Sequence, residues 1–177
     1  MTVLRIYSDG GCRGNQSSSN TGGWGCVLEY GDATRELSGN AVNTTNNIME
    51  MTALLEGFRA IRKENQTIEV FSDSSYLMEC FRNKWYVRWR SNGWITSKKE
   101  PVENRELWEA LLEYLDRHSI SFYRVKGHVN LKTADTAGLY RKFTEWNGSR
   151  FTYEDFVHIT EMNSLCDRLA NDAMDRI

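Results

Sequence analysis

The sequence predicts an α/β fold in which a mixed five-stranded sheet is flanked by helices. Three short segments of strand-like alternation, at about 4–11, 23–30 and 33–39, follow one another, a pattern typical of an antiparallel meander. Two later strand segments, 67–72 and 119–125, each follow a helical segment. Because a strand that returns through a helix pairs in parallel, we expect these two strands to be parallel.

Length and composition are those of one globular domain, which we expect to span residues 1–177. The chain has 40% hydrophobic and 26% charged residues, and no stretch approaches the ~20 apolar residues of a membrane span. The N-terminus lacks a basic-then-apolar signal, which favours a reducing, cytoplasmic setting. The four cysteines and three histidines show no spacing typical of a metal site or a disulfide framework, so we expect free thiols.

The first predicted strand runs from Leu4 into Asp9, which is followed by Gly10 and Gly11. An acidic side chain at a strand end, beside backbone that bends freely, can project into a cleft. Asp-Gly is also a common turn signal, so a simple hairpin turn is the alternative.

A long helix is predicted next, with Thr44 or Asn43 as its N-cap and an end at about Lys63. The helical spacing puts Glu50 on the side that faces the sheet, and Gly57 on this side allows a close approach. The alternative for Glu50 is an acid in the first turns that favours the helix dipole.

Two further acids stand at comparable places. Asp73 follows the strand 67–72 and opens the next helix, where it can also serve as an N-cap. Asp167 stands near the start of the final helix in line with Ala170 and Met174, a costly place for a charge without a partner.

The charge distribution is polarised although the net charge is only −2. Residues 82–99 contain six basic side chains and no acidic one, interleaved with aromatic residues. One interpretation is a solvated helix whose tryptophans fold inward. The other is a groove surface, where cations bind phosphates and aromatic rings lie against sugars or bases.

The four acids Asp9, Glu50, Asp73 and Asp167 can converge at one edge of the sheet. Carboxylates so close repel one another, and their pKa values rise unless a cation compensates. Mg²⁺ prefers oxygen ligands, and two such ions roughly 4 Å apart can activate water and stabilise the leaving oxygen of a phosphodiester.

Seven short segments, taken in their order along the chain, resemble the type 1 ribonucleases H, and in particular the bacterial type that has a basic protrusion. They are YSDGGCRGN (7–15), TTNNIME (44–50), SDS (72–74), NGWIT (92–96), PVENRELW (101–108), VKGH (125–128) and NSLCDRLA (163–170). The resemblance implies the ribonuclease H-like fold and hydrolysis of the RNA strand of RNA–DNA hybrids, giving 5′-phosphate and 3′-hydroxyl ends. It also implies a monomer without membrane contact.

By the same resemblance, two Mg²⁺ ions, for which Mn²⁺ can substitute, are held by Asp9, Glu50, Asp73 and Asp167. His128 matches the position of a residue on a mobile loop that, in the family, assists proton transfer or product departure. The implied RNA-strand contacts are Gly11, Cys12, Asn15, Asn46 and Asn47, and the implied DNA-strand contacts are Thr45, Trp85 and Asn104. The basic protrusion is residues 82–99, with Arg82, Lys84, Arg88, Arg90, Lys98 and Lys99. Helix capping is the alternative for Asn46 and Asn47.

The sequence departs from the family pattern in three places. Asn43 stands where relatives often have arginine, and Ser75 where glutamine is common. The largest departure is an insertion at about 130–160, which we call the C-terminal insertion. Its apolar spacing predicts an added helix around 139–146, and a capping box at 152–155 predicts an N-terminal extension of the last helix. The insertion either packs on the domain edge beside the site or contacts substrate as a lid.

Two other functions remain open from sequence. Another nuclease on the same fold, such as an integrase, transposase or junction resolvase, would lack the TTNN and GH context. A hybrid-binding module that does not cleave would have little reason to keep four carboxylates against a polyanion.

Overall fold

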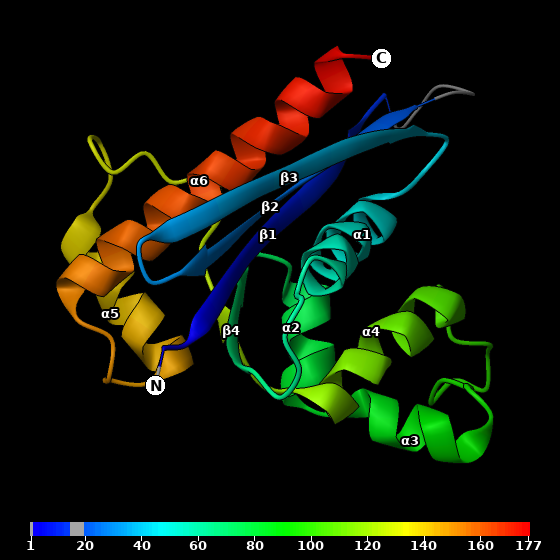
Figure 1. Cartoon of the computed structure of the whole chain (residues 1–177). Coiled ribbons are helices and arrows are strands. Elements are labelled where there is room, and N and C mark those ends of the chain that lie inside the picture. The colour runs from blue at the N-terminus through cyan, green and yellow to red at the C-terminus, as the bar shows by residue number, and fades with distance from the viewer. Residues whose placement is uncertain (1, 15–19) are drawn as a thin grey trace.

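The computed structural model of the protein describes residues 2–14 and 20–177, and its centre is a five-stranded sheet in the order β3-β2-β1-β4-β5 (Figure 1). β1, β2 and β3 pair antiparallel, whereas β4 pairs in parallel with β1, and β5 with β4. The predicted mixed sheet is therefore confirmed. The strands are β1 (Leu4–Arg13), β2 (Thr21–Tyr30), β3 (Ala33–Val42), β4 (Thr67–Ser72) and β5 (Ser119–Arg124).

Helices cover both faces of the sheet. Figure 1 shows α6 crossing one face and α1 lying against the other, with α3 at the far edge of the molecule. The described helices are α1 (Asn46–Arg59), α2 (Ser75–Arg82), α3 (Trp85–Asn92), α4 (Arg105–Arg117), α5 (Thr136–Asn147) and α6 (Tyr153–Asp175). Within the described residues, none of these helices has the length and apolar character needed to cross a membrane.

β1 runs through Asp9 and continues past the predicted end at about residue 11. Its antiparallel pairing with β2 continues to Arg13. Its parallel pairing with β4, however, ends at the pair Ser8 and Ser72. Asp9 and Asp73 therefore both follow directly after the last parallel pair, so the hairpin-turn alternative for Asp9 is wrong.

The caps of α1 and α2 differ from the prediction. Thr45, rather than Thr44 or Asn43, caps α1, and its hydroxyl accepts a hydrogen bond from the Ile48 N–H at 3.1 Å. The helix ends at Arg59, four residues earlier than expected.

At the start of α2, the capping residue is Ser74, whose hydroxyl accepts from the Leu77 N–H at 3.2 Å. The alternative of Asp73 as an N-cap is therefore wrong. Its carboxylate is left available for other contacts.

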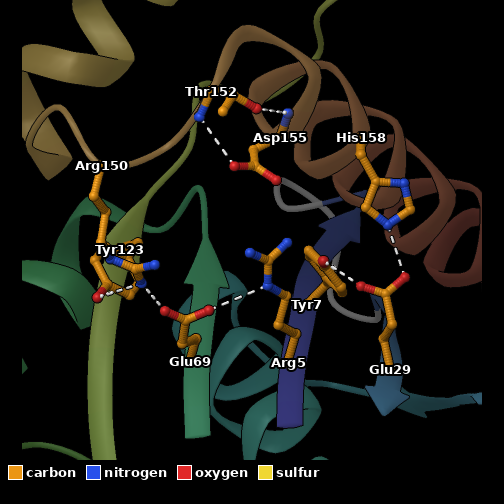
Figure 2. A network of polar contacts seen from close by, with 9 residues as sticks. All are labelled: Arg5, Tyr7, Glu29, Glu69, Tyr123, Arg150, Thr152, Asp155 and His158. Carbon is orange, nitrogen blue, oxygen red and sulfur yellow. Dashed lines mark hydrogen bonds and ion pairs between the residues drawn. The ribbon is translucent and has the colours of Figure 1, made fainter. Parts of the chain in front are cut away.

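The C-terminal insertion forms the predicted added helix, α5, and the extension of α6. Thr152 and Asp155 form the predicted capping box at the start of α6 (Figure 2). Phe143, Phe151 and Phe156 are buried against Phe71 and Tyr7 of the sheet. The insertion thus completes a second hydrophobic core on the face opposite α1.

Polar contacts also fasten α6 and the segment before it to the sheet (Figure 2). Glu69 of β4 forms ion pairs with Arg5 and with Arg150. Glu29 of β2 accepts a hydrogen bond from the Tyr7 hydroxyl at 2.8 Å, and its other carboxylate oxygen lies 2.7 Å from His158 Nε2. Residues far apart in the chain are therefore joined across three strands.

Candidate active site

Three of the four predicted acids form one tight cluster. Asp9 of β1, Glu50 of α1 and Asp73 after β4 each offer a carboxylate oxygen, and these oxygens lie within 4.8 Å of one another. Gly10 makes the approach of β1 to α1 possible, because a Cβ there would lie 2.4 Å from the Met49 carbonyl carbon. The glycine after Asp9 thus brings the start of α1, and with it Glu50, beside Asp9.

Burial and mutual repulsion raise the pKa values in this cluster. Burial, and then the charge of Asp73, raise the pKa of Asp9 to about 8. Burial, and then the charge of Asp9, raise the pKa of Glu50 well above its ordinary value. Burial also raises the pKa of Asp73, against the opposing effect of hydrogen bonds from Asp9 and Asn163.

The residues present fit a divalent cation. Glu50 Oε2 is buried and finds no hydrogen-bond partner among the described residues. A buried carboxylate oxygen without a donor is costly, and a hard cation relieves both this cost and the repulsion among the acids. An all-oxygen donor set of this kind suits Mg²⁺ or Mn²⁺ rather than a soft metal.

Asp167 stands apart from the tight cluster but lines the same pocket of about 720 Å³. Its side chain is 34% exposed, and its Oδ1 lies 3.9 Å from Nδ1 of His128. Because α6 begins at Tyr153, Asp167 belongs to the second half of this helix and not to its start.

His128 belongs to the loop after β5 and has a φ of 56° and a side chain that is 78% exposed. This loop enters the pocket beside Asp167. The imidazole therefore faces solvent at the rim of the acid cluster.

The predicted RNA-strand residues divide into three groups. Gly11, Cys12 and Asn46 line the pocket of the acids, whereas Asn47 is half-buried in the first turn of α1 and is not part of that lining. Asn15 lies outside the described residues. Since Thr45 is the N-cap of α1, the capping alternative for Asn46 and Asn47 is wrong.

A second pocket, of about 960 Å³, lies along the basic protrusion and includes Lys84, Trp85 and Arg88 in its lining. Trp85 is 39% exposed, but Trp89 and Trp94 are buried in the core beneath. The inward-folded interpretation is confirmed for Trp89 and Trp94, whereas the exposed Trp85 leaves the nucleic-acid groove as a prediction.

The six cations of the protrusion are all exposed but are not equivalent. Arg82 donates hydrogen bonds to the Trp146 carbonyl and to Asn147. Arg90 lies 3.7 Å from Asp116. Among the described residues, the other four have no ion pair, namely Lys84, Arg88, Lys98 and Lys99.

The remaining DNA-strand candidates stand at the starts of helices. The hydroxyl of exposed Thr45 accepts the capping bond but still has a proton to donate. Asn104 is the N-cap residue of α4 with a φ of 60°, and its side chain makes no capping hydrogen bond. The Thr45 hydroxyl therefore keeps a donor for a ligand, and the Asn104 side-chain oxygen is not used as a cap.

Sequence reasoning missed one residue of the cluster. Asn163 of α6 is buried and hydrogen-bonds the carboxylate of Asp73. The available signal was its spacing of four residues from Asp167, which puts both side chains on the same face of a helix.

The family model described as RNase H matches residues 1–138. A ribonuclease H of Chlorobium luteolum is 50% identical over 125 residues, which cover 71% of this chain and 83% of that protein. A ribonuclease H of Clostridium botulinum is 39% identical over 175 residues, covering 99% of this chain and 97% of that protein, so the match spans the C-terminal insertion.

Solved structures show the same fold. LC9-RNase H1, described as a type 1 RNase H with the type 2 active-site motif, aligns with a TM-score of 0.71 at 22% identity, over 99% of this chain and 73% of that chain. LC11-RNase H1 in complex with RNA/DNA hybrid aligns with a TM-score of 0.56 at 23% identity, over 98% and 97%. With a family model that matches more than half of its length and a relative that matches nearly all of it, this chain belongs to the ribonuclease H family.

Proposed function

We propose that this protein is an endoribonuclease that hydrolyses the RNA strand of RNA–DNA hybrids with two divalent ions, Mg²⁺ or Mn²⁺, and leaves 5′-phosphate and 3′-hydroxyl ends. The observation that carries this proposal is the convergence of Asp9, Glu50 and Asp73 within 4.8 Å, with Asp167 in the same pocket. The family membership supports it, as does the hybrid bound to the structural neighbour LC11-RNase H1.

The residues of the pocket have different roles in this proposal. Asp9, Glu50, Asp73 and Asp167 would hold the ions, and Asn163 would orient the Asp73 carboxylate. The chemistry that two ions supply at such a cluster is activation of water and stabilisation of the leaving oxygen. His128, exposed at the rim beside Asp167, exchanges a proton with the leaving group or assists product departure.

Strand selection follows from two separate surfaces. Near the acids, Gly11, Cys12 and Asn46 face the RNA strand, where the 2′-hydroxyl is the backbone feature that distinguishes RNA from DNA. Asn15 and Asn47 belong to the same proposed set. Thr45 and Asn104 bind a DNA phosphate, while Trp85 and the basic protrusion follow the DNA strand. We propose that residues 1–177 do this as one domain and as a monomer.

One assay separates the candidate functions. The protein is incubated with labelled RNA–DNA hybrid, double-stranded DNA and double-stranded RNA, with and without Mg²⁺. We expect cleavage of only the RNA strand of the hybrid, and only with metal. Asp9→Asn is expected to bind hybrid without cutting it.

The alternatives give different results in the same assay. Cleavage of duplex DNA would indicate another nuclease on this fold, and binding without cleavage by the parent protein would indicate a hybrid-binding module. Full activity of Asp9→Asn would overturn the assignment of the acid cluster.

A further inference from the structure

Residues at the end of β5 and at the end of α5 form one wall of the pocket that contains the four acids. This wall brings an aromatic ring and cations together. Arg124 and Trp146 line the pocket that holds the four acids. The guanidinium carbon of Arg124 lies 4.3 Å from the centroid of the Trp146 ring, and Nζ of Lys142 lies 5.5 Å from the same centroid. Trp146 comes from the C-terminal insertion, beyond the residues 1–138 that the family model matches.

This wall is held in place by several hydrogen bonds. The Asn147 side chain accepts from the Arg124 N–H at 2.9 Å and donates to the Arg124 carbonyl at 2.8 Å. Arg82 donates to the Trp146 carbonyl from the other side. These bonds fix the backbone that carries Arg124 and Trp146, and the contact of 4.3 Å sets the guanidinium against the ring before any ligand arrives, which lowers the entropic cost of binding.

The pocket contains basic as well as acidic side chains. Arg124 and Lys126 line it together with Asp9, Glu50 and Asp73. Among the described residues, neither of these cations has an acidic partner within ion-pair distance. Arginine presents a planar set of donors that matches a phosphate, and it keeps this ability while stacked on an aromatic ring.

We propose that Arg124 and Trp146 bind the backbone of the cleaved strand beside the site of hydrolysis. Arg124 donates to a phosphate, and the indole holds the guanidinium and contacts the adjacent sugar or base. This inference rests on the proposed function. It assigns to the C-terminal insertion a direct contact with the substrate.

The test measures the affinity of uncleaved hybrid over a series of salt concentrations, with Asp9→Asn as the parent background. Arg124→Gln is expected to weaken binding about tenfold and to reduce the slope of log K against log salt by about one, as expected when one charged phosphate contact is lost. Trp146→Ala is expected to weaken binding about fivefold or more. Arg124→Lys keeps the charge and should retain the salt slope while binding more weakly than the parent.

Arg141→Gln is the matched control, because it removes an equal charge from an exposed position of α5 that does not line the pocket. We expect it to bind like the parent. Trp146→Phe, which keeps an aromatic ring, should bind more tightly than Trp146→Ala, and a thermal unfolding curve identifies any variant that fails to fold.

Parent-like affinity in folded Arg124→Gln and in folded Trp146→Ala, with an unchanged salt slope in Arg124→Gln, would overturn the inference and leave the proposed function standing. A failure of the proposed function would be seen in the cleavage assay instead, because the protein with all four acids intact would then cut no hybrid.

Discussion

Ionised Asp9 and Glu50 lower the stability of the folded protein, and binding of a proton or a cation removes this penalty. Both carboxyl groups are buried, and among the described residues neither forms an ion pair with a basic side chain. A protein selected for stability alone would replace one of them by an amide or an apolar residue. The cluster therefore trades folding stability for the ability to hold cations.

Replacing Asp9 by asparagine should stabilise the metal-free protein. The pKa of Asp9 rises from an ordinary 3.8 to about 8 in the fold, so between these values the folded state binds a proton that the unfolded state lacks. Stability then falls as the pH rises from about 4 to about 8, and Asp9→Asn removes this loss. In buffer with a chelator at pH 8 we expect Tm to rise by at least about 3 °C.

The pH and metal dependence check this explanation. The gain in Tm should shrink toward pH 4 and vanish below it, where Asp9 of the parent becomes protonated in the unfolded state as well as in the folded state. Mg²⁺ should raise the Tm of the parent more than that of the variant. A variant less stable than the parent at pH 8 would contradict the assignment of a raised pKa to Asp9.

Gly10 and Gly11 are adjacent but should respond differently to substitution. A Cβ at Gly10 would lie 2.4 Å from backbone of Met49, whereas one at Gly11 would lie 3.9 Å from the Asn46 side chain. We expect Gly10→Ala to push α1 away from β1, to cost about 2 kcal/mol or more, and to reduce hybrid cleavage because Glu50 moves with the helix.

Gly11→Ala is the control for stability, and urea unfolding measures both variants. It is expected to unfold within about 0.5 kcal/mol of the parent. Equal destabilisation by the two substitutions would show that the close approach at Gly10 is not the cause.

At the scale of elements, α3 serves two purposes. Trp89 packs against Trp94 and Trp108 in the core, with ring centroids 6.1 and 5.6 Å away. Trp85, one turn earlier with its ring 6.5 Å from that of Trp89, is exposed and lines the second pocket together with Arg88. A helix of only eight residues is not stable alone, so this packing is what holds the basic surface in position.

The cations of α3 are expected to contribute unequally to hybrid binding. Arg88 lines the second pocket and forms no ion pair with any described residue, whereas Arg90 lies beside Asp116. Arg88→Gln should weaken hybrid binding about threefold to tenfold and lower the salt slope by about one. Arg90→Gln, with the same loss of charge on the same helix, should have a smaller effect. Fluorescence titration over several salt concentrations measures both, and a larger effect of Arg90→Gln would contradict the proposed path of the DNA strand.

At the scale of the whole molecule, the C-terminal insertion is part of the folding unit. Phe143 of α5 lies 5.5 Å from both Phe151 and Phe156, and Phe151 contacts Phe71 of β4 at 5.8 Å between ring centroids. Deleting residues 133–157 would therefore uncover one face of the sheet. Single substitutions such as those at Arg124 and Trp146 test substrate contact without this consequence.

Phe143→Ala should show how much stability this second core contributes. The side chain is 2% exposed, and truncation leaves a cavity among aromatic rings. We expect a loss of about 3 to 5 kcal/mol and a fall in Tm of about 10 °C. Val42→Ala, at an exposed position of β3, is the control and should change stability little. A small effect of Phe143→Ala would mean that α5 is only loosely attached.

The sequence alone determined the order and type of the elements and the identity of the four acids. Alternation, helical spacing and capping residues act over a few neighbouring positions, so the sheet, the added helix and the capping box at Thr152 could all be predicted. The family motifs are likewise local runs of sequence, and they identified Asp9, Glu50, Asp73 and Asp167.

Tertiary structure decided what depends on contacts between distant segments. It separated Asp167 from the tight cluster of three acids, turned Trp89 inward while Trp85 stayed exposed, and brought Trp146 to the pocket wall against Arg124. No local pattern encodes these outcomes. Each depends on how the helices pack against the two faces of the sheet. That packing brings together segments far apart in the chain, so it is determined only when the whole chain has folded.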